Sequence, residues 1–479
     1  MSGISSAFNA AVAGIQTQSA SLNAISDNIA NSSTTGYKDI GTSFQTLLAN
    51  APGGFSYNAG GVTSKPVQTV TTQGSITNTG IESNLAIGGS GLFAVSQVKT
   101  SNVSGSSTSF NAATYYTRAG DFSVNNSGYL VNSAGYYLDG WSVNSTTGVA
   151  DHNSLSPIQI TQLTDSPQPT TTMTYSANLP SNPASSLNVN TSQTTGIQFA
   201  PTETTIYDSL GAAHTVDLNW TKVAGDNDTW TMSYSSPDSS ITFPNNSPTT
   251  TVSATNASTG TVTTTTLSAP MTVVFNVAAD STTGAQAGSI LSIDQGQGAG
   301  PVTGTVGTAS TIPMDVSFGS TAPTSDNVTI NFGNYGVASG LTQFTGTDIT
   351  SVATSQNGLA PGSFSNMTID QYGFITLNYD NGASRTVYQV PITQFNNENA
   401  LQQEAGGAYS ATTASGAASY DSPGANGTGT LTPQSIESSN VDISSEFTKM
   451  IQTQRAYDAN SKTLTTANEM LQTLEGIIH

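Results

Sequence analysis

The stretch ISSAFNAAVAGIQTQSASLNAISDNIANSSTTGYK, residues 4–38, decides how this chain is organised. Within it, apolar side chains recur every seven residues, at Phe8, Ile15, Leu22 and Ile29. A weaker set with the same spacing comprises Ile4, Ala11, Gln18 and Ile25. Seven residues make close to two helical turns, so the spacing predicts a helix of about 27 residues, roughly 40 Å long, with one apolar stripe. The polar run at residues 31–38 ends this helix.

The last forty residues repeat the pattern. Their apolar side chains are again seven apart, at Ile443, Met450, Tyr457, Leu464, Leu471 and Ile478. The preceding Ser439-Asn440-Val441-Asp442 fits an N-capping box, which predicts a helix of about 36 residues, roughly 54 Å long. We therefore expect the two chain ends to pair in a coiled-coil-like helical domain that comprises residues 1–70 and 437–479.

Between the ends, the hydrophobic period changes from helical to two, which predicts short strands. Apolar residues alternate around turns rich in Asn, Asp and Gly, and we expect hairpins or meanders at 121–131, 206–220 and 367–390. Residues 39–70 show no clear period, because Pro52-Gly53-Gly54 and Gly60-Gly61 break any long element. The expected fold class is a multi-domain chain with one helical end domain and nested all-β domains.

Composition divides the β part into two blocks. Residues 172–340 are rich in Thr, Ser and Asn and contain one basic residue, Lys222. The segments on either side of this block resemble each other in style. We predict a β-rich middle domain from residues 71–171 and 341–436, and an outer β-sandwich-like or barrel-like domain from residues 172–340.

The charge balance and the absence of cysteine exclude several classes of protein. Charged residues make up 8% of the chain, nine residues are basic, and the formal net charge is -20. Phosphate binding needs clustered Lys and Arg, so we expect no nucleic acid partner. Without cysteine there is no disulfide or thiolate metal site. The sequence has no run of about 18 apolar residues, so we expect no membrane insertion. The N-terminus lacks a basic region before an apolar run, so we expect export without a cleavable signal peptide.

Nothing in the sequence predicts catalysis. The three histidines, His152, His214 and His479, lie far apart in the chain. Asp226-Asn227-Asp228 lacks the glycine and terminal glutamate of a calcium loop, and the spacing of Gly296, Gly298 and Gly300 is wrong for dinucleotide binding. We therefore expect no enzyme activity, no catalytic residues, no cofactor and no metal site.

The two helical stripes predict self-assembly. Gln18 interrupts the first stripe, and Gln454, Ser461 and Asn468 flank the second. An isolated helix pair with such narrow apolar seams is marginally stable in water, so other copies of the chain are expected to cover it. The predicted assembly residues are Ile4, Phe8, Ile15, Leu22, Ile25, Ile29, Ile443, Met450, Tyr457, Leu464, Leu471 and Ile478.

Several motifs, in the right order, resemble those of the bacterial flagellar rod and hook protein family. The run Asn28–Lys38 is similar to its N-terminal signature, and Ser439–Tyr457 to its C-terminal signature. Residues 72–93 and 116–130 resemble its internal blocks. The motif residues are Asn28, Ala30, Asn31, Thr35, Gly36, Tyr37, Lys38, Ser439, Asn440, Val441, Asp442, Arg455 and Tyr457.

Within this family, the large middle block and the motif Tyr207–Gly211 with His214 resemble the hook members. The resemblance implies a homopolymer that forms a curved, flexible tube, acts as a universal joint that transmits torque from rod to filament, and encloses the export channel. It also implies contacts with the distal rod, the hook cap, the hook–filament junction protein and the flagellar type III export apparatus. The expected location is extracellular, at the hook and basal body of the flagellum.

Two alternatives stay open at this point. One is a sibling of the hook subunit, namely a distal-rod or hook–filament junction protein. The other belongs to a different class, a secreted β-rich adhesin, which explains the Ser- and Thr-rich β blocks but not the paired helical ends.

Overall fold

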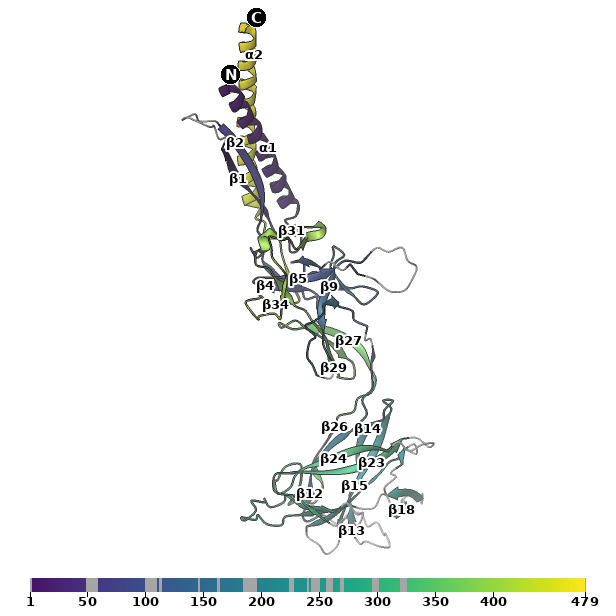
Figure 1. Ribbon diagram of the computed structural model, residues 1–479. Helices are drawn as coiled ribbons and strands as arrows, with labels where there is room; N and C mark the ends of the chain where they lie inside the picture. The colour runs from purple at the N-terminus through teal and green to yellow at the C-terminus, as the bar shows by residue number, and fades with distance from the viewer. Residues whose placement is uncertain are drawn as a thin grey trace. The chain divides into compact units, whose positions relative to one another are not determined.

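The structure is a computed structural model, and it describes residues 2–48, 59–99, 110–111, 114–144, 147–161, 164–183, 196–223, 228–238, 241–242, 250–255, 262–267, 271–294, 301–318 and 325–478. The chain forms two compact units (Figure 1). Unit 1 comprises Met1–Leu163, Phe364–Asn378 and Ser384–His479, and unit 2 comprises Thr164–Ser363 and Tyr379–Ala383. The finer division into three domains stays a prediction.

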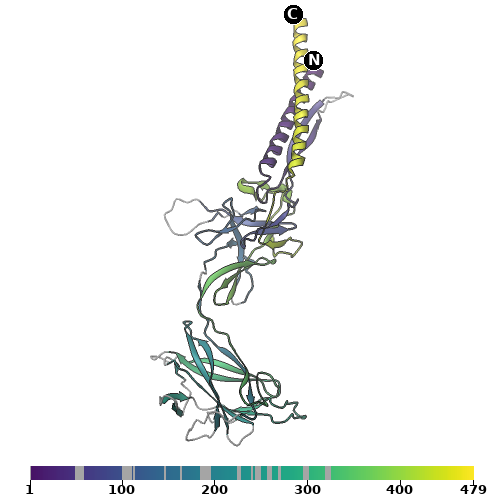
Figure 2. The ribbon, with the colours of Figure 1, turned by 180° about the vertical axis from the view of Figure 1, so that it is seen from behind.

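Helices at both ends of the chain are confirmed. They are α1 (Ser2–Ala30) and α2 (Ile443–Ile478), which lie side by side in unit 1 (Figures 1 and 2). The Asp442 Oδ1 accepts the backbone N–H of Ser444 at 2.9 Å, as an N-cap residue does. The Ser439 hydroxyl instead accepts the N–H of Val441 at 3.3 Å. The expected capping box is therefore wrong, and Asp442 alone caps α2.

A long hairpin, β1 (Ile40–Leu48) with β2 (Ala59–Gln68), packs on α1. The expectation that Gly60-Gly61 breaks any long element is wrong. Gly61 adopts φ 83° within β2, a conformation that glycine allows. Pro66 is tolerated because β2 pairs with β1 and with no other described strand. The hairpin and α2 thus both cover α1.

The rest of unit 1 consists of β-strands and two short 3-10 helices, η1 and η2. One sheet has the order β27-β28-β29-β9-β5-β6-β32-β31. β3 pairs with β35 and β4 pairs with β34, so strands from residues 76–88 lie beside strands from residues 430–437. The predicted hairpin at 121–131 is confirmed as β7 with β8. The described elements are β3 (Ile76–Asn78), β4 (Leu85–Gly88), β5 (Leu92–Ser96), β6 (Tyr115–Thr117), β7 (Ser123–Val124), β8 (Leu130–Val131), β9 (Tyr137–Ser142), β10 (Ser156–Pro157), β27 (Gly362–Ile369), β28 (Phe374–Tyr379), β29 (Ser384–Gln389), β30 (Ile392–Gln394), η1 (Glu398–Ala400), β31 (Gln402–Gln403), η2 (Ala405–Gly407), β32 (Ala408–Ser410), β33 (Ser419–Asp421), β34 (Thr430–Pro433) and β35 (Ser435–Glu437).

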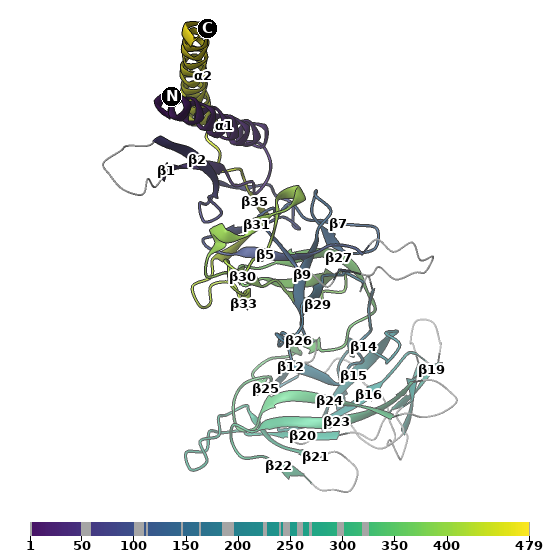
Figure 3. The ribbon, with the colours of Figure 1, turned by 45° about the horizontal axis from the view of Figure 1, so that its top comes forward.

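Unit 2 contains two larger sheets (Figure 3). Their strand orders are β17-β23-β24-β12-β25 and β13-β15-β16-β20-β21-β22. Side chains from both sheets form one hydrophobic core, in which Trp220, Trp230, Tyr175 and Phe332 are fully buried. The predicted hairpin at 206–220 is confirmed as β14 with β15. The strands are β11 (Thr164–Asp165), β12 (Thr172–Pro180), β13 (Gly196–Gln198), β14 (Thr202–Tyr207), β15 (Ala213–Val223), β16 (Thr229–Ser235), β17 (Ile241–Thr242), β18 (Thr250–Thr255), β19 (Val262–Leu267), β20 (Met271–Phe275), β21 (Ile290–Asp294), β22 (Val302–Thr303), β23 (Ala309–Phe318), β24 (Ser325–Asn334), β25 (Leu341–Phe344) and β26 (Thr350–Gln356).

Unit 2 extends beyond the predicted block 172–340 for a structural reason. β12 pairs in parallel with β25 and antiparallel with β26, and both partners follow residue 340. These pairings join segments more than 160 residues apart, so the composition that marks the block 172–340 does not predict them.

Candidate functional site

The α1–α2 seam is built from small and polar side chains. We define it as Gly14, Ser21 and Asn28 of α1 with Glu446, Thr453, Asn460 and Ala467 of α2. Asn28 donates to the Glu446 carboxylate at 3.2 Å, and a Cβ on Gly14 would lie 2.7 Å from the Asn460 amide nitrogen. Asn28 follows Gly14 along α1, whereas its partner Glu446 precedes Asn460 along α2 by the same number of residues. The helices therefore run antiparallel in one register. Every seam residue except the half-buried Asn460 is buried.

None of the predicted assembly residues belongs to this seam. Ile25 is buried, and the other residues of the first stripe from Phe8 to Ile29 are half-buried on α1. On α2, Met450 and Leu464 are half-buried, while Ile443, Tyr457 and Leu471 are exposed. The side chains of Ile4 and Ile478 lie outside the described residues. Small and polar residues, such as Gly14 against Asn460, occupy the contact between the helices in place of the larger stripe side chains.

An exposed apolar face runs along the start of α2. Ile443, Phe447 and Ile451 are spaced four apart and therefore lie on one side of the helix. Their exposed fractions are 46%, 51% and 52%. This face includes one predicted residue, Ile443, and two that the seven-residue pattern missed.

The base of the helices is joined by Asn28. Its side-chain oxygen accepts the backbone N–H of Ile40 at 2.9 Å and the Tyr37 hydroxyl at 3.2 Å. Its side-chain nitrogen donates to the carbonyl of Ile40 and to Glu446. Asn440 makes a similar tie from the other end of the chain, because its side-chain oxygen accepts the N–H of Asp39 at 2.8 Å. Motif residues from both chain ends therefore meet here.

A buried ion network, which we call the Glu437 network, lies next to this junction. The Glu437 carboxylate accepts a hydrogen bond from Lys38 Nζ at 2.5 Å and another from Arg118 Nη1 at 3.0 Å. All three side chains are at most 1% exposed. The same carboxylate accepts the backbone N–H of Gly74 at 2.7 Å. Its backbone carbonyl accepts the N–H of Gly36 at 2.8 Å. Residues far apart in sequence are thus held by one side chain.

Burial perturbs several ionisable groups around this junction. Burial lowers the pKa of Lys38, partly offset by Glu437. Burial also raises the pKa of the nearby Glu398 carboxyl, an effect that Arg118 and Lys38 oppose. Burial and the neighbouring Asp27 raise the pKa of Tyr37 to about 12, so its hydroxyl stays protonated as a hydrogen-bond donor at neutral pH.

The sequence pattern missed Glu437 and Glu446. One signal was available: Lys38 and Arg118 are two of only nine basic residues, and both lie in family motifs. Buried cations need anionic partners, so acids near the opposite chain end were candidates. Gly36 shows how closely this region packs, because it has φ 68° and a Cβ there would lie 2.5 Å from the backbone of Ala119.

The other motif residues surround the junction without joining it. Asn31 and Thr35 are half-buried in the loop after α1, and Ala30 is exposed. Ser439 and Val441 are half-buried before α2, while Asp442 is exposed as its cap. Arg455 and Tyr457 are exposed on α2.

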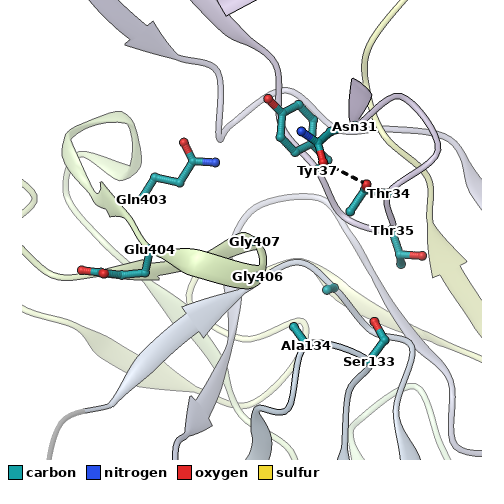
Figure 4. Close-up of a pocket in the computed structure, with 11 residues that line it drawn as sticks. Asn31, Thr34, Thr35, Tyr37, Ser133, Ala134, Gln403, Glu404, Gly406 and Gly407 are labelled. Atoms are coloured by element: carbon teal, nitrogen blue, oxygen red, sulfur yellow. Dashed lines mark hydrogen bonds between the residues drawn. The ribbon is translucent and has the colours of Figure 1, made fainter. Parts of the chain in front are cut away.

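A cleft of ≈ 310 Å³, lined by both polar and apolar atoms, lies beside the junction (Figure 4). It is open between the loop after α1, a turn of the β body and the segment around η2. Its Glu404 carboxylate accepts a hydrogen bond from Ser410 at 2.8 Å. The lining has no nucleophile–base pair, and it comprises Asn31, Thr34, Thr35, Tyr37, Ala119, Ser133, Ala134, Gln403, Glu404, Gly406 and Gly407.

Other chemistry-bearing groups are structural. In unit 2, the His214 ring nitrogens lie 2.7 Å from Asp238 and 3.4 Å from Asp208, which ties a turn to β15. In unit 1, the His152 ring packs on Trp141 at 4.1 Å. Within the described part of the chain, no group of three or more His, Asp or Glu side chains is placed to hold a metal ion. None of the described helices has the length and apolar character to span a membrane.

Four family descriptions match successive parts of the chain. "Flagella basal body rod protein" matches residues 8–38, and "Flagellar hook protein FlgE/F/G D1 domain" matches 86–191. "Flagellar basal body protein FlaE D2 domain" matches residues 174–405, and "Flagellar basal body rod FlgEFG protein C-terminal" matches 432–477. The matches therefore include the loop after α1 and all but the last residue of α2.

Several relatives that align over nearly the whole chain are flagellar hook proteins. The flagellar hook protein FlgE of Treponema pallidum is 31% identical over 495 aligned residues, which cover 97% of each chain. The FlgE protein of Caulobacter vibrioides is 28% identical, with 99% of each chain covered. The FlgE protein of Escherichia coli is 28% identical, with 98% of this chain and 99% of that one covered.

Proposed function

Because this chain belongs to the family of flagellar hook proteins, we propose that it polymerises with itself into a curved, flexible tube between the rod and the filament. The chain is a structural subunit of the flagellar hook. In the proposed tube, it transmits torque and encloses the export channel. The observation that carries the proposal is the exposed apolar face of Ile443, Phe447 and Ile451 on α2.

This face supports polymerisation because its burial is a driving force that the single chain does not use. Each large apolar side chain that becomes fully buried contributes about 1.5–3 kcal/mol. The hairpin adds further exposed apolar side chains, Phe44, Leu47 and Val67. Val67 pairs with Gly41, so it lies on the opposite face of the hairpin from Phe44. The hairpin therefore adds separate apolar contacts, and the face on α2 is the surface that a second copy of the chain would cover.

The predicted stripes fit the same proposal. In the tube, Phe8, Ile15, Leu22 and Ile29 of α1 would contact α2 stripes of neighbouring copies in a coiled-coil-like arrangement. The helical ends, 1–70 and 437–479, would form the inner wall. The β domains proposed at 71–171 with 341–436, and at 172–340, would lie further out. The distal rod, hook cap and hook–filament junction protein are the proposed neighbours, and the type III apparatus the proposed route of export without a cleavable signal.

Electron microscopy of the purified chain and two matched variants tests the proposal. We expect curved tubes from the native chain. Phe447→Glu places a charge on the apolar face and should abolish assembly while the circular dichroism spectrum of the chain stays unchanged. Leu210→Glu makes the same change at an 81% exposed position of unit 2 and should leave assembly intact. Tubes of normal yield from Phe447→Glu would rule out this face as the assembly surface.

A further inference from the structure

We propose that the turn Tyr207–Gly211, together with His214, holds in place the two strands at which the main segment of unit 2, Thr164–Ser363, begins and ends. We call these strands, residues 164–171 and 357–363, the connecting strands. Held in this way, they move with the core of unit 2 and do not act as a free tether. The inference goes beyond self-assembly, and its test uses the unassembled chain.

The connecting strands have few pairings of their own. β11 pairs with the start of β27 over two residues. Gln168 exchanges two backbone hydrogen bonds with Leu359, at 3.0 and 2.8 Å. A two-stranded ribbon is at best marginally stable in water. The connecting strands therefore need support from the structure beside them.

Thr170 joins the connecting strands to the end of β14. Its backbone N–H donates to the carbonyl of Tyr207 at 2.9 Å, and its hydroxyl oxygen accepts the N–H of Tyr207 at 2.8 Å. The same hydroxyl donates to the side-chain oxygen of Gln356 at 3.2 Å. Thr170 is 2% exposed, so water does not compete for these hydrogen bonds.

Gly211 lets the turn approach the connecting strands closely. It adopts φ 83°, and a Cβ there would lie 2.5 Å from Pro361 Cδ and 2.6 Å from Pro167 Cβ. One proline from each connecting strand therefore packs against the turn. A larger residue does not fit at these distances, so this contact requires glycine.

Asp208 and His214 fix the turn itself. Asp208 Oδ1 accepts two backbone N–H groups that follow it, at 2.9 and 2.7 Å. Its Oδ2 lies 3.4 Å from His214 Nε2, and His214 Nδ1 lies 2.7 Å from Asp238 Oδ2. The buried His214 ring also packs on Phe318 of β23, with ring centroids 4.9 Å apart. The turn is thus fixed to both large sheets of unit 2.

These contacts assign a task to the motif that resembles the hook members. The connecting strands run directly into β12 and out of β26, which belong to one large sheet. The turn joins β14 to β15 of the other large sheet. A force along the connecting strands therefore reaches both sheets, because the motif supplies the second attachment.

Hydrogen–deuterium exchange on the unassembled chain tests the proposal. Gly211→Ala adds a Cβ that pushes the connecting strands away from the turn. We expect the amides of Gln168 and Thr170 to exchange at least about tenfold faster than in the native chain, while the amides of β16 stay protected. The matched control is Gly284→Ala, in another turn of unit 2. Gly284 has φ 77°, and a Cβ there meets nothing within 4 Å, so the strain is similar but the connecting strands are untouched.

A second variant tests the histidine. His214→Ala removes the ring that lies between the Asp208 and Asp238 carboxylates, so the same two amides should again exchange faster. His152→Ala makes the same change at an exposed position of unit 1 and should leave this exchange unchanged.

Three outcomes overturn the proposal. Native exchange of the connecting strands in Gly211→Ala or in His214→Ala would show that the turn does not hold them. Equal acceleration in Gly284→Ala would show that strain in any turn suffices. If Gly211→Ala also loses the protection of β16, Thr170→Val decides, because it removes the hydroxyl and keeps the size of the side chain. Unchanged exchange at Gln168 and Tyr207 in a folded Thr170→Val chain overturns the proposal, and selectively faster exchange there supports it.

Discussion

The α1–α2 seam and the core of unit 2 are built in opposite ways. The core of unit 2 buries Trp220, Trp230 and Phe332 completely, with ring centroids of Phe332 and Trp220 6.2 Å apart. The seam places Gly14 against Asn460 and joins Asn28 to Glu446. Large apolar side chains fill the core of unit 2. The α1–α2 seam is formed by small and polar side chains and buries little apolar area. The difference indicates that unit 2 has an apolar core of its own within one chain, and it supports the proposal that neighbouring copies stabilise the helices.

The largest effect is expected from a substitution that weakens the core of unit 2, the more apolar of the two interfaces. Phe332→Ala removes a fully buried ring from the unit 2 core and should lower its free energy of unfolding by about 3–5 kcal/mol. Urea unfolding followed by the fluorescence of Trp220 and Trp230 measures this. Leu210→Ala, at an 81% exposed position, should change the same free energy by less than about 0.5 kcal/mol. A small effect of Phe332→Ala would mean that the core is not tightly packed.

The next effect depends on pH and concerns a buried polar group in unit 1. Burial raises the pKa of Asp139 to about 6, and the hydroxyl of Ser96, 2.7 Å away, only partly opposes it. Because burial disfavours the charged carboxylate, unit 1 is more stable while Asp139 is neutral. This contribution to its stability is fully present below the unfolded pKa of 3.8 and is lost as the pH rises through the folded pKa of about 6. Asp139→Asn should therefore make unit 1 more stable at pH 8, by up to about 3 kcal/mol.

Urea unfolding of unit 1 at pH 4 to 8 checks this, because the gain should vanish at the acidic end. Asp151→Asn makes the same change at an exposed position and is the matched control. An equal gain at all pH values would show that charge burial is not the cause.

Local patterns in the sequence predicted local structure well. The helices and the turns at Asn125–Gly128 and Asp208–Gly211 follow from periodicity and turn chemistry, which act between near neighbours. The sequence did not predict the β1–β2 hairpin, because two adjacent glycines such as Gly60-Gly61 usually interrupt a strand. They do not interrupt it where the strand backbone adopts a positive φ, which glycine allows.

The seam and the Glu437 network could not be predicted in the same way. A helix offers several stripes seven residues apart, and the most apolar one need not face the partner. The choice depends on what else covers the helix, here the hairpin on α1. The bond from Lys38 to Glu437 spans 399 residues, so it follows from the pairing of β3 with β35 and not from any local motif.

A smaller effect is expected from a change that fills the seam. Gly14→Leu would force the Asn460 side chain away and should destabilise the helix pair by about 1–2 kcal/mol, as overpacking does. The loss of ellipticity at low temperature and the faster exchange of α1 amides measure this. Ala20→Leu, at an exposed position of α1, is the control. Adding Asn460→Ala to Gly14→Leu should restore part of the loss, and no restoration would contradict the register of the seam.

The smallest effect on the single chain concerns the face that the seam leaves uncovered. Ile451 is 52% exposed, so Ile451→Ser should change the stability of the unassembled chain by less than about 0.5 kcal/mol. If the apolar face were the real contact between α1 and α2, the same change would cost about 2 kcal/mol or more, because a buried side chain would be lost. Thermal unfolding of the unassembled variant separates these outcomes. A small cost in the single chain together with a higher critical concentration for assembly would show that the two sides of α2 serve different partners: one side its own chain, the other its neighbours.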